Sequence, residues 1–277
     1  MSNTASRLQL GIALSCVDLG MLERKAARAQ AAGYHRCQVS FRWEATPGEA
    51  WAAEDVCKRR GLEVVAFGAY INLLRPDDEA FHGISIEGAR NLIDGMRYAA
   101  CRRIVVYSGT YGRLPSEAHP DNQTPEARRA ATAEARDLAI RLRARGGYLC
   151  IEPHYAHVIR TPEDCTAFVS AVDPDVVRIT FDPANLVPPE EIDRHSELLP
   201  PLVAALAPVL GLVHLKDIRR RPGGLDYPPP GRGEMDYARL MAAIRAQNLA
   251  LPALIEHADE QSEAVMRAAR EYLEQYL

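Results

Sequence analysis

The sequence has no long apolar run and no excess of basic residues, and each absence excludes a class of protein. No stretch of the 277 residues approaches the 18 or so uninterrupted apolar side chains of a membrane span, and the start, MSNTASRLQ, lacks the apolar core of a signal peptide. We therefore expect a cytoplasmic protein that is not bound to a membrane. The 33 Lys and Arg against 37 Asp and Glu give a net charge of −4, which offers no basic surface for nucleic acid.

Paired cysteines and glycine-rich phosphate loops are also missing. The six cysteines are scattered without a CxxC pair, so we expect buried, reduced thiols rather than a zinc site or a disulfide framework. Neither GxGxxG nor GxxxxGK[ST] occurs, which argues against a nucleotide-binding, doubly wound open sheet, the main alternative among α/β folds.

What is present is a regular alternation of short β-rich runs and amphipathic segments. The runs are nearly continuous and apolar, as in IVVY and ALI, which is typical of parallel strands buried on both faces. Eight such units without a flexible linker predict a (β/α)₈ TIM barrel that spans residues 1–277 as a single domain. The predicted strands are Leu8–Ala13, Arg36–Ser40, Glu63–Tyr70, Arg103–Ser108, Tyr148–Glu152, Val177–Asp182, Gly211–Lys216 and Pro252–Glu256.

Helix start signals separate several of these strands. Thr124-Pro125 and Thr161-Pro162 each place a capping residue before a proline at the first helical position, and Asp236 caps the segment YARLMAAIRAQ. The longest predicted irregular stretch, residues 218–234, is rich in Arg, Gly and Pro. Loops of that length in compact domains tend to be functional.

The last four predicted strands all end in residues that can bind metal ions. Glu152, Asp182, His214 and Glu256 terminate LCIE, RITFD, LVH and ALIE in turn. Active sites of TIM barrels lie at the carboxyl ends of the strands, so these side chains are expected to converge. Three carboxylates and one imidazole suit a hard or borderline divalent ion, with Mn²⁺ the first choice and Co²⁺, Mg²⁺ or Zn²⁺ as alternatives.

At these positions the sequence resembles the xylose isomerase-like barrels, the sugar phosphate isomerase/epimerase group. The motifs are IEPH at 151–154, TFDPAN at 180–185, VHLKD at 213–217, PGRG at 230–233 and IEH at 255–257. The resemblance implies one metal ion on Glu152, Asp182, His214 and Glu256, with Glu152 and Glu256 also acting as the catalytic acid/base pair. It further implies a small sugar or polyhydroxy carbonyl compound as substrate, and a homo-oligomer.

The chain departs from this group at one position. Many members carry a histidine three residues after the aspartate of strand six, where this sequence has Asn185, which can donate a hydrogen bond but cannot titrate near neutrality. The abasic-site endonucleases of the superfamily use additional histidines after strands three and four, and those histidines are missing here. Candidate substrate-binding residues near the expected mouth are His154, Asn185, Lys216, Arg232, Tyr70 and Asn72.

The function expected from these features is a metal-dependent isomerase or epimerase that acts on a ketose or keto-sugar through an enediolate. Two alternatives stay open. A lyase or dehydratase of a keto-polyol, of the inosose or dehydroshikimate type, would use the same four ligands, and a non-catalytic sugar-binding barrel would keep the shape without turnover.

Overall fold

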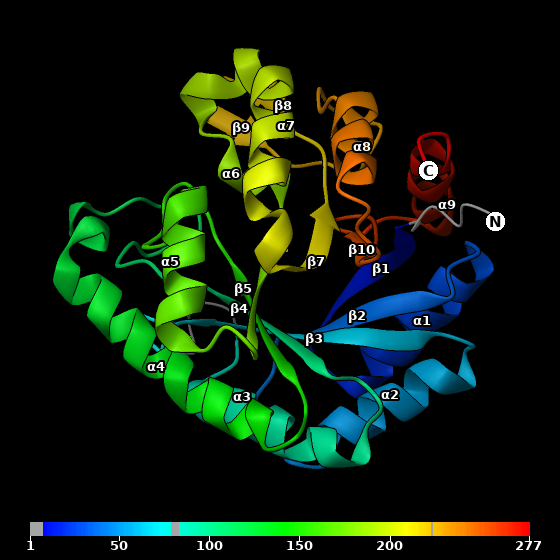
Figure 1. Ribbon diagram of the computed structural model, residues 1–277. Coiled ribbons are helices and arrows are strands. Elements are labelled where there is room, and N and C mark those ends of the chain that lie inside the picture. The colour runs from blue at the N-terminus through cyan, green and yellow to red at the C-terminus, as the bar shows by residue number, and fades with distance from the viewer. Residues whose placement is uncertain (1–7, 79–82, 223) are drawn as a thin grey trace, which may run out of the picture.

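The computed structural model describes residues 8–78, 83–222 and 224–277. Within this part of the chain, eight parallel strands close into a barrel in the order β1-β10-β7-β6-β5-β4-β3-β2, and helices surround it (Figure 1). The predicted (β/α)₈ fold is confirmed. The barrel strands are β1 Gln9–Cys16, β2 Arg36–Phe41, β3 Glu63–Asn72, β4 Arg103–Tyr107, β5 Tyr148–Glu152, β6 Val177–Phe181, β7 Leu210–Leu215 and β10 Pro252–Ile255.

The outer layer consists of helices that pack on their sequence neighbours around the barrel. Consecutive contacts run from α1 to α2, α3, α4 and α5 and on to α7 and α8, and α9 packs against α1. The helices are α1 Leu19–Ala31, α2 Glu49–Arg59, α3 Ile86–Gly95, α4 Pro125–Arg143, α5 Pro162–Val172, α6 Pro183–Leu186, α7 His195–Leu206, α8 Tyr237–Ala246 and α9 Glu263–Glu274.

The predicted strands correspond to the barrel strands, with changes at the ends. The largest change is in β1, which was expected to end at Ala13 but continues to Cys16, because Ser15 and Cys16 keep their pairing with Ser40 and Phe41 of β2. Strand β3 likewise runs on from Tyr70 to Asn72. Polar residues at a strand end look like the start of a loop in the sequence, whereas neighbouring strands extend the ladder through them.

The helix start signals act as expected. The side chain of Thr124 accepts a hydrogen bond from Ala127 N, and Asp236 accepts one from Arg239 N. Thr161 forms a reciprocal capping box with Asp164. These bonds satisfy backbone donors that have no partner inside the helix, so they fix where the connections from the barrel enter the helices.

The stretch 218–234, predicted to be irregular, contains a small hairpin. Strands β8 (Arg219–Arg221) and β9 (Gly224–Asp226) pair antiparallel beyond β7. Arg219 and Arg221 both form ion pairs with Asp226 across this hairpin. Three adjacent arginines look like a solvated loop in the sequence, but the acidic partner five to seven residues later stabilises strand pairing.

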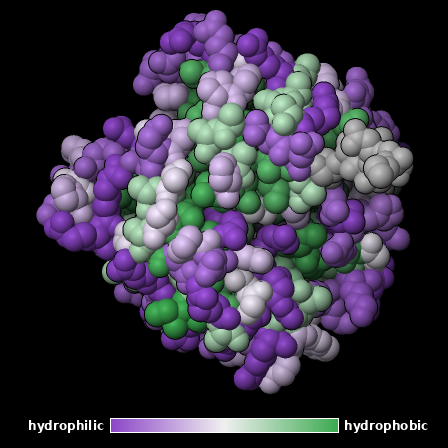
Figure 2. Space-filling view, in the orientation of Figure 1, coloured by the Kyte–Doolittle hydropathy of each residue, from purple (hydrophilic) through white to green (hydrophobic). Residues whose placement is uncertain are grey.

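Two groups of buried apolar residues stabilise the fold. The larger lies mainly between the barrel and the helices, and a smaller one inside the barrel includes Val105, Cys150, Leu212 and Leu254. The face seen in Figure 2 is covered mostly by hydrophilic residues, with hydrophobic residues visible between them. In the described part of the chain, no helix has both the length and the apolar character needed to cross a membrane.

Candidate metal centre and active site

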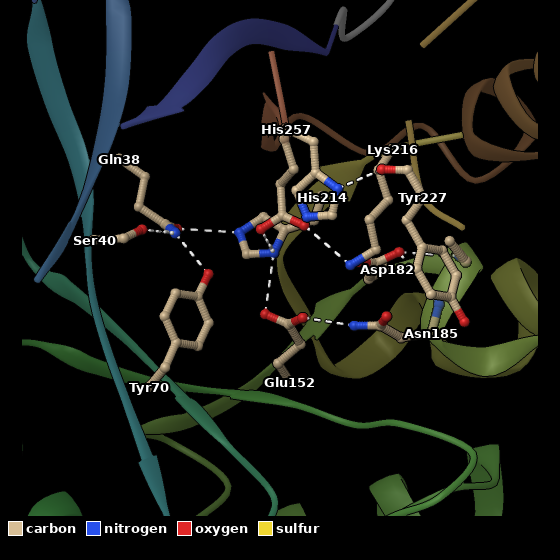
Figure 3. Close-up of polar contacts among 12 residues, drawn as sticks. Gln38, Ser40, Tyr70, Glu152, Asp182, Asn185, His214, Lys216, Tyr227 and His257 are labelled. Atoms are coloured by element: carbon tan, nitrogen blue, oxygen red, sulfur yellow. Dashed lines mark hydrogen bonds and ion pairs between the residues drawn. The ribbon is translucent and has the colours of Figure 1, made fainter. Parts of the chain in front are cut away.

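Four side chains from successive strands converge at the carboxyl end of the barrel. Glu152 is the last residue of β5, Asp182 directly follows β6, His214 lies in β7, and Glu256 directly follows β10. One potential ligand atom from each of them lies within 4.8 Å of all the others. The structure therefore brings together the four residues that the strand ends suggested, and Figure 3 labels three of them, Glu152, Asp182 and His214.

In each of these residues, one polar atom is held by the protein while another faces the centre. Glu152 Oε1 accepts a hydrogen bond from Asn185 Nδ2 at 2.7 Å. Asp182 Oδ1 accepts one from Ala184 N at 2.9 Å, at the start of α6. His214 Nε2 lies 3.1 Å from Gln38 Oε1, and Glu256 Oε2 lies 3.1 Å from Lys216 Nζ. The side chains are thus oriented by bonds that leave one atom of each for another partner.

The inward-facing atoms fit a divalent cation. Among the described residues, Glu152 Oε2, Asp182 Oδ2 and His214 Nδ1 are buried without a partner in hydrogen-bond geometry. They do lie at ion-pair distance from neighbours: Nδ1 of His214 is 3.1 Å from Glu152 Oε2 and 3.2 Å from Glu256 Oε1. Buried polar atoms without such a partner are costly, and coordination of a metal ion removes that cost. The donor set of three carboxylates and one imidazole is typical of Mn²⁺, Co²⁺ or Mg²⁺ sites.

Lys216 completes the charge balance of the centre. Its Nζ lies 2.6 Å from Asp182 Oδ2 and 3.1 Å from Glu256 Oε2, and its side chain is almost fully buried. Three carboxylates and one ammonium leave two net negative charges, which one divalent ion would neutralise. The structure therefore places Lys216, predicted as a substrate-binding residue, against two of the candidate metal ligands.

The crowded charges alter the pKa values of the group. Burial lowers the pKa of His214, but the carboxylates of Glu256 and Glu152 outweigh it and raise that pKa to about 9. Burial raises the pKa of Asp182 to about 6, against the opposing effect of Lys216. In Glu256 burial also raises the pKa, whereas Lys216 and His214 lower it to a net value of about 2. The carboxylates thus favour positive charge at their centre.

Gln38 fixes the orientation of His214, and sequence reasoning missed it. Its amide nitrogen donates to Tyr70 Oη at 2.7 Å and to Ser40 Oγ at 3.0 Å, so its oxygen is the atom that faces His214 Nε2. Nε2 of His214 therefore carries a proton, and Nδ1 is the nitrogen that faces the carboxylates and would bind a metal ion after losing its own proton. The clue in the sequence is RCQVSF, where Gln38 and Ser40 are polar residues two apart among the apolar residues Cys37, Val39 and Phe41.

A cavity of about 230 Å³ opens from this centre to solvent. Tyr70, Tyr107, Ser40 and Arg42 line it together with the glutamates. The structure thus places Tyr70 on the wall of the cavity, as the sequence suggested. Ser15 and Asp259 also line it, and Asp259 forms a buried ion pair with Lys25 at 2.6 Å. The pair joins α1 to the loop after β10 and shapes this side of the mouth.

Two of the predicted substrate-binding residues are engaged by the loops around the mouth. Asn72 donates from Nδ2 to Thr110 O, and its Oδ1 accepts from Leu74 N and Thr110 N, so the amide joins the loops after β3 and β4. His154 Nδ1 accepts from Ala156 N. Burial, His157 and Lys216 lower the pKa of His154 to about 2, so its ring is neutral.

Arg232 lines a different cavity from that of the metal centre, whereas Asn185 contacts one of the candidate ligands. Arg232 is exposed and lines a neighbouring cavity rather than that of the metal centre. Its loop is held by Asp217, whose carboxylate accepts from the backbone N–H groups of Gly231, Arg232 and Met235. The PGRG motif is thus organised around a buried aspartate. Asn185 binds Glu152, so it supports the centre where relatives are expected to carry histidine.

Comparison with known proteins decides the family. The family model described as xylose isomerase-like TIM barrel matches residues 26–276. The chain belongs to this family. Among curated proteins no match was found.

Solved structures of xylose isomerase-like barrels superpose over nearly the whole chain. A xylose isomerase-like TIM barrel protein from Mycobacterium smegmatis in complex with magnesium has 18% identity, coverage of 96% of each chain and a TM-score of 0.71. A D-allulose 3-epimerase from Methylomonas sp. has 16% identity, coverage of 98% and 99%, and a TM-score of 0.69. A 3-keto-D-glucoside 4-epimerase from E. coli has 16% identity, coverage of 97% and 100%, and a TM-score of 0.70. At these identities the likeness establishes a common fold.

Proposed function

We propose that this protein is a divalent-metal-dependent isomerase or epimerase of a ketose or keto-sugar, with Mn²⁺ as the first-choice ion. Glu152 and Glu256 are the proposed acid/base pair, and Glu152, Asp182, His214 and Glu256 the proposed metal ligands. Members of the same fold with similar length include a D-allulose 3-epimerase and a 3-keto-D-glucoside 4-epimerase, which supports a sugar carbonyl substrate.

The observation that carries the proposal is that, in each candidate ligand, one polar atom is held by the protein while another faces the centre. One atom is tied to Asn185, to the start of α6, to Gln38 or to Lys216, while another lies within 4.8 Å of its three counterparts. The inward-facing atoms contact one another and Lys216 at ion-pair distances of 2.6 to 3.2 Å, and a divalent ion would give the carboxylates a compensating charge at their centre. A metal centre requires that arrangement, because ligands must be held before the ion arrives.

The two glutamates approach the centre from different sides. Strands β5 and β10, which carry them, are separated in the barrel by β6 and β7. In the proposed reaction one glutamate removes the proton from the carbon next to the substrate carbonyl, and the C–H electron pair forms the enediolate double bond. The other glutamate returns a proton to the opposite face, which inverts that carbon. A bound divalent ion would supply Lewis-acid stabilisation of the negative charge on the substrate oxygens.

Neighbouring side chains hold the two glutamates in defined orientations for proton transfer. Asn185 holds Glu152 through Oε1, and Lys216 holds Glu256 through Oε2. Each carboxylate therefore keeps one defined orientation toward the cavity during proton transfer, and preorganised geometry of this kind lowers the barrier. Tyr70 and Tyr107 line the wall of the cavity and limit the access of bulk water to the reacting carbon.

The proposal is tested by metal analysis and solvent exchange together. The purified protein, loaded with Mn²⁺ and desalted, is expected to hold about one equivalent of metal, and Asp182→Ala is expected to hold none. The loaded protein is then incubated in D₂O with a panel of ketoses and keto-sugars. Deuterium at the carbon next to the carbonyl is the expected result, and nuclear magnetic resonance identifies the carbon that has exchanged.

The outcomes separate the candidate activities. Exchange with inversion or carbonyl migration supports the isomerase or epimerase. Exchange followed by loss of a β-hydroxyl group would assign the same centre to a lyase. Metal binding and sugar binding without exchange would contradict catalysis and leave a sugar-binding barrel, and a parent protein that holds no metal after loading would overturn the mechanism.

A further inference from the structure

A second cavity adjoins the metal-site cavity. It has a volume of about 410 Å³, larger than the 230 Å³ of the first, and its walls come from the hairpin region and the loop after β10. His257 and Glu260 line both cavities, so the two share one boundary. The two cavities therefore lie side by side along His257 and Glu260.

The shared boundary is built from residues tied to the metal centre. His257 follows Glu256, has a positive φ of 62°, and hydrogen-bonds through Nδ1 to the carbonyl oxygen of Tyr227 (Figure 3). The ring of Tyr227 lies 5.6 Å from Lys216 Nζ. A left-handed backbone is uncommon for a residue other than glycine and persists where the surroundings enforce it. The strained His257 thus links the position of Glu256 to the wall of the second cavity.

The charges that line the second cavity are balanced. Arg219 forms an ion pair with Asp226 at 2.8 Å, and Arg232 shares the lining with Glu260. A phosphate or carboxylate needs an excess of cationic donors, as in arginine clusters that bind anions. Two arginines and two carboxylates instead offer both donors and acceptors, which suits a neutral group with many hydroxyls.

Apolar surfaces complete this lining. Tyr227, Pro228 and Pro229 contribute flat, weakly polar faces beside the charged groups, and Gln261 adds an amide. A pyranose ring has the same two-sided character, with hydroxyls around its edge and C–H groups on its faces. Small-molecule sites commonly combine an apolar wall with a few placed polar groups in this way.

We propose that the second cavity binds a second sugar ring, joined by a glycosidic bond to the ring that reacts at the metal centre. The preferred substrate is then an oxidised glycoside of two rings rather than a free monosaccharide. This inference rests on the proposed function, because it assumes that the reacting ring occupies the metal-site cavity.

The test compares two probes that differ only in the second ring. Methyl 3-keto-glucoside and 3-keto-maltose are each incubated with the Mn²⁺-loaded protein in D₂O, and kcat and KM for deuterium exchange are measured. The disaccharide is expected to have a KM at least tenfold lower. In the double variant Arg232→Ala/Gln261→Ala that advantage is expected to shrink at least fivefold, because both side chains line only the second cavity.

A matched control and a binding experiment keep the result interpretable. Arg239→Ala removes an exposed arginine of α8 outside both cavities, and it should preserve the preference for the disaccharide. Binding of unoxidised maltose and methyl glucoside is followed by saturation-transfer nuclear magnetic resonance, with inorganic phosphate as a competitor. If the parent prefers maltose and the double variant abolishes that preference, the second-ring site is supported. A failure of every probe to exchange deuterium would refute the proposed function but not this site. Equal KM values and equal binding for the one-ring and two-ring probes, or displacement of maltose by phosphate, would overturn the second-ring site.

Discussion

Two adjacent layers inside the barrel, built from the same strands, have opposite character. The lower layer includes Cys150, Leu212 and Leu254, which are buried and apolar. Two residues further along each strand lie Glu152, His214 and Glu256. Alternate residues of a strand face the same side, so each pair points into the barrel at successive heights.

The comparison shows how a strand can hold a charged centre in a fixed place. The lower layer is fully buried and fixes the positions of the strands. The residues of the next inward layer, Glu152, His214 and Glu256, are therefore held in place by the same strands. Carboxylates on flexible loops would separate to relieve their repulsion, whereas ligands at strand ends are held within 4.8 Å by the backbone. Stability and chemistry are thus divided between layers two residues apart.

The largest expected effect is a loss of proton exchange when the upper layer, formed by Glu152, His214 and Glu256, is altered. Glu256→Gln keeps the size of the side chain but removes its ability to accept a proton, so deuterium exchange at saturating Mn²⁺ should fall about 10²- to 10⁴-fold, the usual contribution of a general acid or base. Glu152→Gln should behave alike. Thermal unfolding checks that each variant folds, and a variant with near-parent exchange would remove that glutamate from the acid/base pair.

The next effect concerns the lower layer. Leu212→Ala leaves a cavity in the fully buried interior and should lower the free energy of unfolding by about 2–5 kcal/mol, measured by urea denaturation. Leu114→Ala, at a loop residue that is 63% exposed, is the matched control and should change it by less than about 0.5 kcal/mol. The affinity for Mn²⁺ should stay close to that of the parent in both. A strong loss of affinity in Leu212→Ala would show that the layers are coupled.

A smaller effect is expected at the link between His214 and Gln38. Gln38→Leu removes the acceptor for Nε2 and should weaken Mn²⁺ binding about 10- to 100-fold, as measured by isothermal titration calorimetry. Gln38→Glu keeps an acceptor and should restore most of the affinity. Gln123→Leu, at the last residue of the short 3₁₀ helix that precedes α4, is the control with unchanged affinity. Parent-like binding by Gln38→Leu would contradict the positioning role.

The smallest effect lies at the rim, where His157 contacts Ser108 through Nδ1 and Pro115 O through Nε2. Burial lowers the pKa of His157 to about 4. The unfolded chain, with a histidine pKa of about 6.5, then binds more protons between these values, so stability falls as pH drops through this window. The expected loss is about 1 kcal/mol between pH 6.5 and 5.5. His157→Gln should show a correspondingly shallower pH dependence in denaturation curves, and an unchanged slope would assign the titration to other groups.

Much of the barrel could be predicted because its patterns are local. Continuous apolar runs, the caps at Thr124, Thr161 and Asp236, and the alternation of elements depend on residues close in sequence. Helix α7 was harder, since Pro200 and Pro201 lie inside it and proline normally disfavours a helix interior. The hairpin at Arg219–Asp226 was missed for a similar reason, because a run of like charges conceals the pairing that Asp226 stabilises.

By itself, the sequence determined the order of strands and helices and the candidates at the strand ends. Hydrophobic periodicity and helix-capping residues indicate these features, and both depend only on residues close together in the chain. Only the tertiary structure decided which atoms of those candidates face the centre. Gln38 meets His214 across 176 positions of the chain, and Asn185 holds Glu152 from another strand's connection. Closure of the barrel creates these contacts, because it joins strands that are distant in sequence and leaves their ends at one mouth.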